Sequence, residues 1–324
     1  MLSSTVPALV LAPMEGVTDA AMRALQGQCG AFSYAVSEFL RVSHSVPPKS
    51  VFLRHVPEFK TQSRTATHLP VQVQILGGDA GRMAESSVVA HAAGATAIDI
   101  NFGCPAKTVN RHDGGATLLK YPTRIREIVA AVRAALPITV PVSAKLRLGW
   151  DSIEPIFENA LMAEQGGASW ITIHARTRDA GYQPPVFWKT VGQVRESLSI
   201  PVIANGDIWT LDDFHRCRDE TGCTHFMIGR GALADPRLAY RIACVLGSVL
   251  PDGRDPNEPI DWSMKMSNLV IWSHQFEENR PERIVRRLKQ WLKLAATHGS
   301  FRQFDFIKQA RTPQELIEGL RSTG

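Results

Sequence analysis

Short apolar segments rich in β-branched residues recur along the chain from Ala8 to Gly231. Most are separated by stretches of helical length whose apolar positions lie three and four residues apart, as in TRIREIVAAVRAAL. The segments are ALVLAPM, YAVSEF, PVQVQILG, AIDINFGC, VSAKLRLG, WITIHART, PVIANGD and HFMIGRG. Strands alternating with helices at this spacing, eight times within roughly 240 residues, predict a (β/α)8 TIM barrel, an α/β fold. An open doubly wound sheet is the alternative, and the eightfold count disfavours it.

The pattern changes beyond the last of these segments. LPDGRDPNEPIDW has the composition of a linker, and the residues after it have helical spacing only. We therefore expect a barrel domain over residues 1–250 and a small all-helical domain over residues 257–324. In RPERIVRRLKQWLKLAA, one stripe is apolar: Ile284, Leu288, Trp291, Leu292 and Ala295. The basic residues Arg283, Arg286, Arg287, Lys289 and Lys293 occupy the remaining surface.

Charge is distributed unevenly between these two parts. Residues 262–324 hold 11 Lys and Arg against 6 Asp and Glu, whereas residues 1–261 hold 25 of each sign. The whole net charge of +5 therefore lies in the helical part, which is expected either to bind a polyanion or to present a solvated face.

Composition narrows the class of protein further. The N-terminal apolar run is short, is interrupted by Pro7 and Pro13 and has no basic residue before it, and no run of membrane-spanning length follows. We expect a cytoplasmic protein without membrane contact. The 5 cysteines form no C-x-x-C pair, which disfavours disulfides and a metal site.

Polar residues stand at the end of every predicted strand. In a barrel these ends meet at one mouth, so their side chains are expected to form a ligand site. They are Met14, Glu15, Glu38, Gln74, Asn101, Cys104, Lys145, Arg147, His174, Arg176, Asn205, Asp207 and Arg230.

Glycine-rich loops follow the last two strands, where barrels commonly bind phosphate. Gly206, Gly229 and Gly231 would bring backbone N–H groups close to the ligand, and Arg230 could bind it through two hydrogen bonds. The alternative is that these are turn glycines only. Lys145, in the fifth strand, could be either a Schiff-base nucleophile or a cation facing an electron-rich cofactor ring.

Cys104 ends the fourth strand and is followed by Pro105 and a polar, glycine-containing loop. A free cysteine titrates near ~8.5, so at neutral pH it carries its proton and suits a general acid better than a nucleophile. The alternative is an inert, small core residue.

The motifs APMEGVTD, VQILG, DINFGCPAKTVNRHDGGATLL, KLRLGW, IHART, PVIANGDI and IGRGAL, in this order, resemble the tRNA-dihydrouridine synthases. TVN…GGATLLK and KQWL are most similar to the bacterial subgroup that modifies uridine 16 of the tRNA D-loop. The resemblance implies an FMN-dependent barrel with a C-terminal helical domain, non-covalently bound FMN and NADPH as reductant.

Carried over residue by residue, the resemblance also implies roles for these positions. Pro13, Met14 and Glu15 would border the flavin, and Gln74 and Lys145 would contact its ring system. Cys104 would be the catalytic acid that protonates carbon 5 of the uracil while hydride reaches carbon 6. The residues implied to hold the ribityl chain and phosphate are His174, Asn205, Gly206, Asp207, Gly229 and Arg230.

A uracil inside a folded tRNA has to be extruded before it can reach a barrel mouth, at a cost of a few kcal/mol, so further tRNA contacts are expected. The candidates for orienting the RNA or the target base are Arg41, Asn101 and Arg147. Those for phosphate contacts are Arg283, Arg286, Arg287 and Lys289. We expect a monomer, and the pattern assigns no role to Arg111, His112 or Asp113. A chain that ends near Pro256 is expected to fold as a flavin-loaded barrel, since every predicted flavin residue precedes the linker.

Three other functions fit parts of this pattern. An FMN barrel that acts on a free pyrimidine would need the flavin residues but not the basic helices. An RNA-binding protein on a degenerate barrel would not need Cys104, Lys145 and the phosphate loops together. A lyase that forms a Schiff base on Lys145 would not be yellow when purified.

Overall fold

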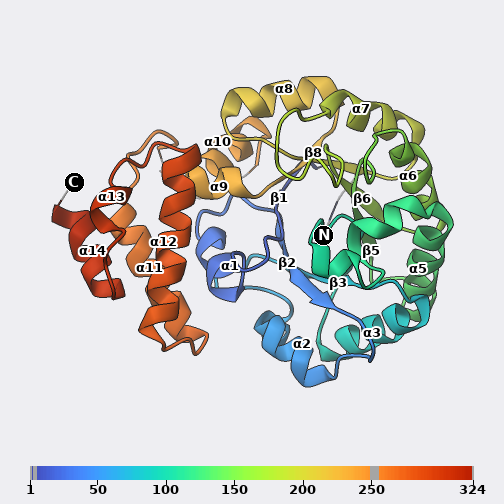
Figure 1. Ribbon diagram of the computed structural model, residues 1–324, viewed down its shortest axis with the longest axis horizontal. Helices are drawn as coiled ribbons and strands as arrows, with labels where there is room; N and C mark the ends of the chain where they lie inside the picture. Colours follow the sequence, from blue (N-terminus) through green and yellow to red (C-terminus); the bar gives the residue numbers. More distant parts are fainter. Residues whose placement is uncertain (1, 3–5, 249–254, 323–324) are drawn as a thin grey trace.

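Strands β1 to β8 close into a barrel in chain order, each parallel to its neighbours, in a computed structural model that describes residue 2 and residues 6–248 and 255–322. The predicted TIM barrel is confirmed and the open sheet is wrong (Figure 1). The predicted domain end at residue 250 lies outside the described residues. The strands are β1 Ala8–Leu11, β2 Tyr34–Arg41, β3 Val71–Leu76, β4 Ile98–Asn101, β5 Val142–Arg147, β6 Trp170–His174, β7 Val202–Asn205 and β8 His225–Ile228.

Helices cover the outside of the barrel and form the C-terminal part. Within the described residues, none of them is both long and apolar enough to cross a membrane. Around the barrel they are α1 Ala20–Gly27, α2 Lys49–His55, η1 Pro57–Thr61, α3 Ala80–Ala93, α4 Lys107–Asn110, η2 Gly115–Lys120, α5 Pro122–Ala135, α6 Pro155–Gln165, α7 Trp188–Ser197, α8 Leu211–Thr221, α9 Arg230–Ala234 and α10 Leu238–Val245. The C-terminal helices are α11 Trp262–Gln275, α12 Pro281–His298, α13 Phe304–Ile307 and α14 Pro313–Ser322.

Local sequence signals explain where these helices lie. In α5 the buried residues are Ile125, Ile128, Val129 and Val132, the stripe that the spacing predicts. Helix α8 begins with a capping box between Thr210 and Asp213, which satisfies its first N–H groups and ends the loop after β7 within a few residues. This loop therefore has a fixed path at the barrel mouth.

Strand register sets the order of side chains inside the barrel. Gln74 of β3 pairs with Asp99 of β4, which pairs with Ser143 of β5. Two residues further on, Asn101 pairs with Lys145. Because side chains two residues apart on a strand point to the same face, polar groups lie in successive layers toward the mouth.

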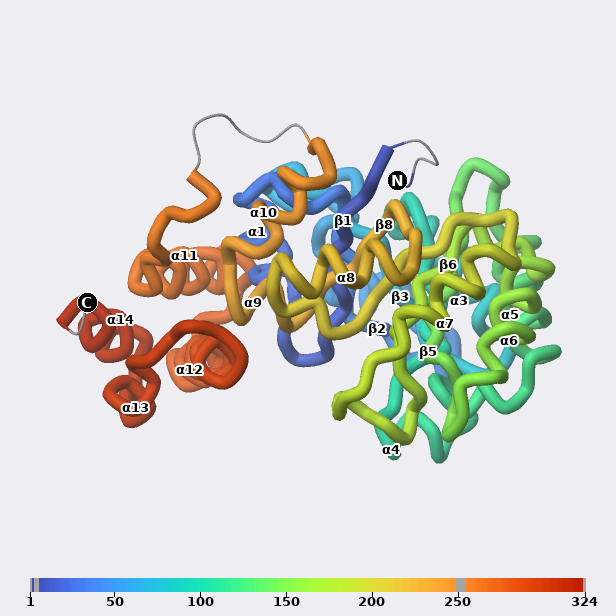
Figure 2. Tube along the Cα trace, turned by 90° about the horizontal axis from the view of Figure 1, so that it is seen from above, coloured from blue at the N-terminus to red at the C-terminus, as the bar shows by residue number. Residues whose placement is uncertain are grey.

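The C-terminal helices pack against one side of the barrel (Figures 1 and 2). Their buried residues form one apolar cluster together with Ala21, Met22 and Leu25 of α1 and Leu233 of α9. The predicted stripe of α12 is buried there, joined by Val285. Trp291 Nε1 donates a hydrogen bond to the Leu233 carbonyl oxygen at 2.9 Å, so the two parts share a core.

Candidate active site

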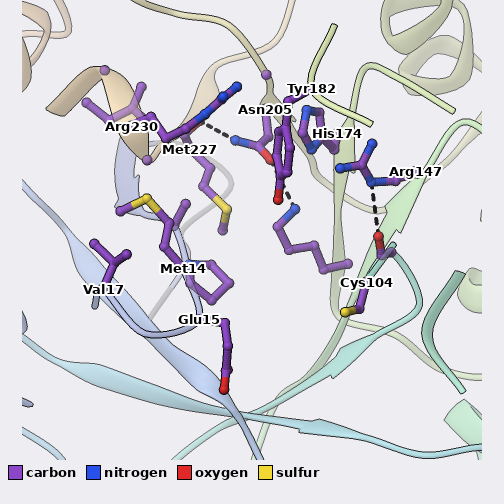
Figure 3. Close-up of a pocket in the computed structure, with 18 of the residues that line it drawn as sticks. Met14, Glu15, Val17, Cys104, Arg147, His174, Tyr182, Asn205, Met227 and Arg230 are labelled. Carbon is purple, nitrogen blue, oxygen red and sulfur yellow. Dashed lines mark hydrogen bonds between the residues drawn. The ribbon is translucent and has the colours of Figure 1, made fainter. Parts of the chain in front are cut away.

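A cavity of about 360 Å³ opens at the carboxyl ends of the strands, within the usual size range of ligand pockets (Figure 3). It is lined by all the residues that we predicted to border a flavin and by five others with predicted roles. These residues are Pro13, Met14, Glu15, Glu38, Gln74, Asn101, Cys104, Lys145, Arg147, His174, Asn205, Gly206, Asp207, Gly229, Arg230 and Gly231. The sequence therefore predicts correctly that these positions lie together.

The loop after β1 forms one wall of the cavity. The Val17 and Thr18 N–H groups donate to the Met14 carbonyl oxygen, which closes the loop on itself. Val17 N–H also donates to Glu38 Oε1 at 2.9 Å. The sequence suggested that Glu38 follows the second strand, but it lies within β2. Burial and then the nearby Glu15 raise the pKa of Glu38, and burial raises that of Glu15.

Cys104 lies at the side of the cavity opposite Arg230 (Figure 3). Asn101 Oδ1 accepts hydrogen bonds from the backbone N–H groups of both Gly103 and Cys104, each at 2.9 Å. Burial, and to a smaller extent Glu15, raises the pKa of the Cys104 thiol, while a backbone hydrogen bond at Ala106, and then Arg147 and Arg41, partly oppose this. The side chain is therefore held as a neutral thiol, the form that can donate a proton.

Lys145 reaches into the cavity from β5. Its Nζ donates to Asn205 Oδ1 at 3.0 Å, and Asn205 Nδ2 donates to the Met227 carbonyl oxygen at 2.8 Å. Burial, and then Arg147, lowers the pKa of Lys145 to about 8, with Asp99 opposing the shift. The amine remains largely protonated at neutral pH and is a fixed cation in the cavity.

The loops after β6, β7 and β8 place a cluster of charged groups and aromatic rings at the cavity. The Asp207 carboxylate pairs with Arg176, which is buried, and with Arg230 at 3.3 Å. The Arg230 guanidinium lies 4.4 Å from the ring centre of Tyr182 and 4.8 Å from that of Trp209. Asp207 therefore orients Arg230.

These residues fit a bound phosphorylated flavin. His174 is buried, and burial followed by the cations Arg147 and Lys145 lowers its pKa well below the usual value, so it is neutral. Its Nε2 has no hydrogen-bond partner among the described residues, as expected for a group that awaits a ligand. A Cβ on Gly206 would lie 2.9 Å from the His174 ring, so only glycine fits at this φ of 121°. In the described residues, no group of His, Cys, Asp and Glu could hold a metal ion.

Two predicted RNA contacts near the mouth have other partners. Arg147 is only 2% exposed and donates hydrogen bonds to the carbonyl oxygens of Gly103, Thr177 and Gly181. Its first role is therefore to join the loops after β4 and β6. Arg41 is the last residue of β2, lies outside the cavity lining and contacts the Thr108 carbonyl oxygen at 3.5 Å.

A groove of about 1140 Å³ separates α1, α2 and η1 from α11 and α12. It is lined by the cations Arg54, Lys60, Arg64, Arg283, Arg286 and Arg287 and by the acids Asp19, Glu58, Glu277 and Glu278, and Glu38 lines both the groove and the cavity. The groove therefore carries charges of both signs. Arg283 and Arg286 are exposed, whereas Lys289 is half-buried and lies outside the groove lining.

Arg287 was predicted to lie on the free basic surface of α12, but the structure shows it paired with the barrel. It forms an ion pair with Asp19 and donates to the Val17 carbonyl oxygen at 2.9 Å, and its side chain is 18% exposed. The spacing along α12 placed Arg287 near the edge of the apolar stripe but could not show that the barrel meets it there. This arginine fastens α12 to the loop after β1.

The segment Arg111 to Asp113, to which the sequence assigned no role, contains a structural anchor. Asp113 pairs with Arg124 at 2.6 Å, and Arg124 also donates to the Gly78 carbonyl oxygen at 2.7 Å. Asn110 donates to the Cys104 carbonyl oxygen at 3.3 Å. The polar loop after Cys104 is therefore fixed at several points.

Among the cavity-lining residues that sequence reasoning missed are Tyr182, Trp209 and Leu294. Tyr182 is 53% exposed at the mouth, in the long loop after β6, and an aromatic residue in such a loop was the available signal. Trp209 comes two residues after Asp207 and stacks on His298, with ring centres 4.3 Å apart. Leu294 belongs to α12, and only the docking of that helix brings it to the cavity.

Comparison with known proteins agrees with this arrangement. A family model described as dihydrouridine synthase matches residues 10–320. The tRNA-dihydrouridine(16) synthase of Pseudomonas putida is 41% identical over 285 residues, which cover 88% of this chain and 86% of that protein. The enzyme of the same name from Neisseria meningitidis serogroup B is 39% identical over 314 residues, covering 95% and 93%.

Solved structures with a similar fold are too different in sequence to indicate more than the fold. Histamine dehydrogenase from Rhizobium sp. 4-9 matches with a TM-score of 0.54 at 13% identity, over 82% of this chain and 49% of that chain. The old yellow enzyme homologue from Zymomonas mobilis matches with a TM-score of 0.51 at 12% identity, over 78% of this chain and 95% of that one. Both alignments include most of the barrel.

Proposed function

Because the chain belongs to the dihydrouridine synthase family, we propose that it reduces a uridine of the tRNA D-loop to 5,6-dihydrouridine, at position 16. The choice of position 16 rests on the two tRNA-dihydrouridine(16) synthases described above. They align with most of this chain at 41% and 39% identity. We further propose non-covalently bound FMN as cofactor and NADPH as reductant. Residues 1–250 would be the catalytic domain and residues 257–324 the tRNA-binding domain.

The residues around the cavity support FMN as the occupant. Arg230 is oriented by Asp207 and would bind the phosphate, and the free His174 Nε2 would bind the same end of the molecule. Lys145 and Gln74 would contact the ring system. When bound and reduced by NADPH, FMN supplies the hydride that carbon 6 of the uracil accepts.

The Cys104 thiol carries the proposal for the reaction itself. It lies on the wall of the cavity, its backbone is held by Asn101, and its pKa is raised by burial. A neutral thiol at this place would donate its proton to carbon 5 of the uracil. Lys145 and Arg147 would supply fixed positive charge nearby while the base is reduced.

The groove between the barrel and the C-terminal helices supports tRNA as the substrate. It adjoins the cavity through Glu38 and carries exposed arginines on α12. Binding free energy from phosphate contacts in the groove would offset the free-energy cost of extruding the base toward the cavity.

Mapping dihydrouridine by mass spectrometry in tRNA from a deletion strain tests the proposal. We expect position 16 to lose its modification, the wild-type gene to restore it, and the Cys104→Ala gene to fail. The purified wild-type protein should be yellow. Loss of modification at another position would overturn position 16, and unchanged tRNA would overturn the proposed activity.

A further inference from the structure

A chain of buried hydrogen bonds links Asp99, outside the cavity lining, to the backbone of Cys104. Gln74 Nε2 donates to Asp99 Oδ2 at 2.6 Å, and Asn101 Nδ2 donates to Gln74 Oε1 at 2.8 Å. Asn101 Oδ1 then accepts the N–H groups of Gly103 and Cys104. Asp99 is 2% exposed and does not line the cavity, whereas Gln74, Asn101 and Cys104 do.

Strand register brings these side chains together. Gln74, Asp99 and Ser143 are paired neighbours on β3, β4 and β5, and Asn101 lies one layer nearer the mouth. Asp99 Oδ1 accepts a hydrogen bond from Ser143 Oγ at 2.5 Å, so each of its oxygens has a donor. Within the described part of the chain, Asp99 thus has two hydrogen-bond partners, and of these only Gln74 leads toward Cys104.

The two ends of this hydrogen-bond chain, the Asp99 carboxylate and the backbone N–H groups of Gly103 and Cys104, both require that each amide has its nitrogen toward Asp99 and its oxygen toward Cys104. An ionised carboxylate only accepts hydrogen bonds, and a backbone N–H only donates them. If either amide turned over, two donors or two acceptors would face each other in a buried place, which is costly. The pKa of Asp99 is raised by burial to about 6, with Ser143, Gln74 and Lys145 opposing, so the group is largely ionised at neutral pH.

We propose that Asp99 is a positioning residue, which fixes the amides of Gln74 and Asn101 and thereby the place of Cys104 in the cavity. It also directs both amide oxygens into the chain, and each amide retains a second N–H. The cavity lining at Gln74, Asn101 and Lys145 then offers donors, which suit the carbonyl oxygens of a pyrimidine ring. Its importance for the reaction rests on the proposed role of Cys104.

Three variants of the full-length, flavin-loaded protein separate positioning from stability. Asp99→Val removes both acceptor oxygens with a side chain that suits a buried strand. Ser143→Ala disturbs the same buried cluster but leaves the bonds from Gln74 to Cys104 intact, so it is the matched control. Asp99→Asn keeps one oxygen, which can still accept from Gln74, and is the conservative rescue.

The readout is the rate at which iodoacetamide alkylates each cysteine at one neutral pH, followed by peptide mass spectrometry. In Asp99→Val we expect Cys104 to react about five- to tenfold faster, because freeing it from its buried place lowers the thiol pKa toward the ordinary value. In Ser143→Ala and Asp99→Asn its rate should stay within about twofold of wild type. Cys217 and Cys223 are buried in the barrel and report its folding in the same experiment.

Turnover on tRNA completes the test. In Asp99→Val we expect kcat to fall at least about tenfold, the effect of one lost buried hydrogen bond, while Cys217 and Cys223 stay unreactive. Equal Cys104 rates in Asp99→Val and Ser143→Ala would overturn the proposal, as would an unchanged Cys104 rate in Asp99→Val. Alkylation needs no substrate, so it tests the positioning of Cys104 independently of turnover. If the wild-type protein formed no dihydrouridine, the proposed function would be overturned, but the alkylation rates would still decide whether Asp99 positions Cys104.

Discussion

Cys104 allows binding and turnover to be separated at a single residue. In the proposed reaction its thiol contributes a proton, whereas other side chains form most of the cavity wall. Cys104→Ala should therefore retain FMN and tRNA affinity and lose roughly 10²- to 10⁴-fold in kcat, the usual contribution of a general acid. Single-turnover assays and tRNA binding measured on the same preparation check this. Wild-type turnover in the variant would make Cys104 an inert cavity residue.

The charge on Glu15 should affect the pH at which kcat falls on the alkaline side. In the proposed reaction, activity needs the protonated thiol. Because the pKa of Cys104 is raised, the rate should hold above neutral pH and fall only at higher pH. Glu15 contributes to that raised pKa, so Glu15→Gln should move the alkaline fall of kcat toward lower pH. A pH–rate profile with saturating tRNA measures the shift, and a shift to higher pH would contradict the assignment.

Arg230 should be sensitive to geometry as well as charge. Its guanidinium is held between two aromatic rings and paired with Asp207. Arg230→Lys keeps the charge but loses the planar fork, so FMN affinity should fall about tenfold, and further in Arg230→Ala. Fluorescence titration of the flavin-free protein gives both constants. Equal affinity in all three proteins would remove Arg230 from the phosphate site.

Helix α12 presents two neighbouring arginines with different expected effects. Arg286 is exposed in the groove, so Arg286→Ala should flatten the slope of log tRNA affinity against log salt by roughly one unit, without loss of thermal stability. Arg287 joins α12 to the loop after β1, so Arg287→Ala should instead cost about 1–3 kcal/mol of stability.

Each variant is the control for the other, since both remove one positive charge from adjacent positions. The salt series and a thermal melt are measured on both proteins. If the two arginines proved interchangeable in both measurements, the structural distinction between them would be wrong.

At the scale of elements, the sequence predicts positions along the chain better than contacts between distant segments. Lys145 and His174 were predictable because polar residues at the carboxyl ends of parallel strands meet at one mouth. Arg287 and Leu294 were not, because helical spacing shows which side of α12 is buried but not which neighbour covers it. Tyr182 and Trp209 lie in loops, whose paths depend on the elements around them.

The barrel and the C-terminal helices share a core, which disfavours the expectation of an independent barrel. The C-terminal helices bury Met22 and Leu25 of α1, and Met14 and Val17 of the β1 loop pack against the same cluster. Leu294 of α12 lines the cavity directly. The flavin site therefore depends partly on residues beyond the linker.

A chain that ends near Pro256 should accordingly be unstable. Uncovering Met22, Leu25 and Leu233 would forfeit about 1.5–3 kcal/mol for each fully buried side chain, and the β1 loop would lose its support. We expect low solubility, binding of a hydrophobic dye and poor flavin retention. Expression of residues 1–256 beside the full chain checks this, and a soluble, yellow fragment with the melting temperature of the full chain would restore the independent barrel.

The hydrogen-bond chain from Asp99 to Cys104 also limits how this protein can evolve. An amide at position 99 together with a carboxylate at position 74 would satisfy the same partners, since the amide would donate to the carboxylate and the carboxylate would accept from Asn101. The two substitutions are not equivalent as first steps. Gln74→Glu alone sets two carboxylates face to face, whereas Asp99→Asn alone leaves an oxygen that accepts from Gln74. The exchanged pair is therefore reached at lower cost when position 99 changes first, because two facing carboxyl groups must share a proton. We expect most lineages that carry a glutamate at position 74 to have passed through ancestors with an asparagine at position 99.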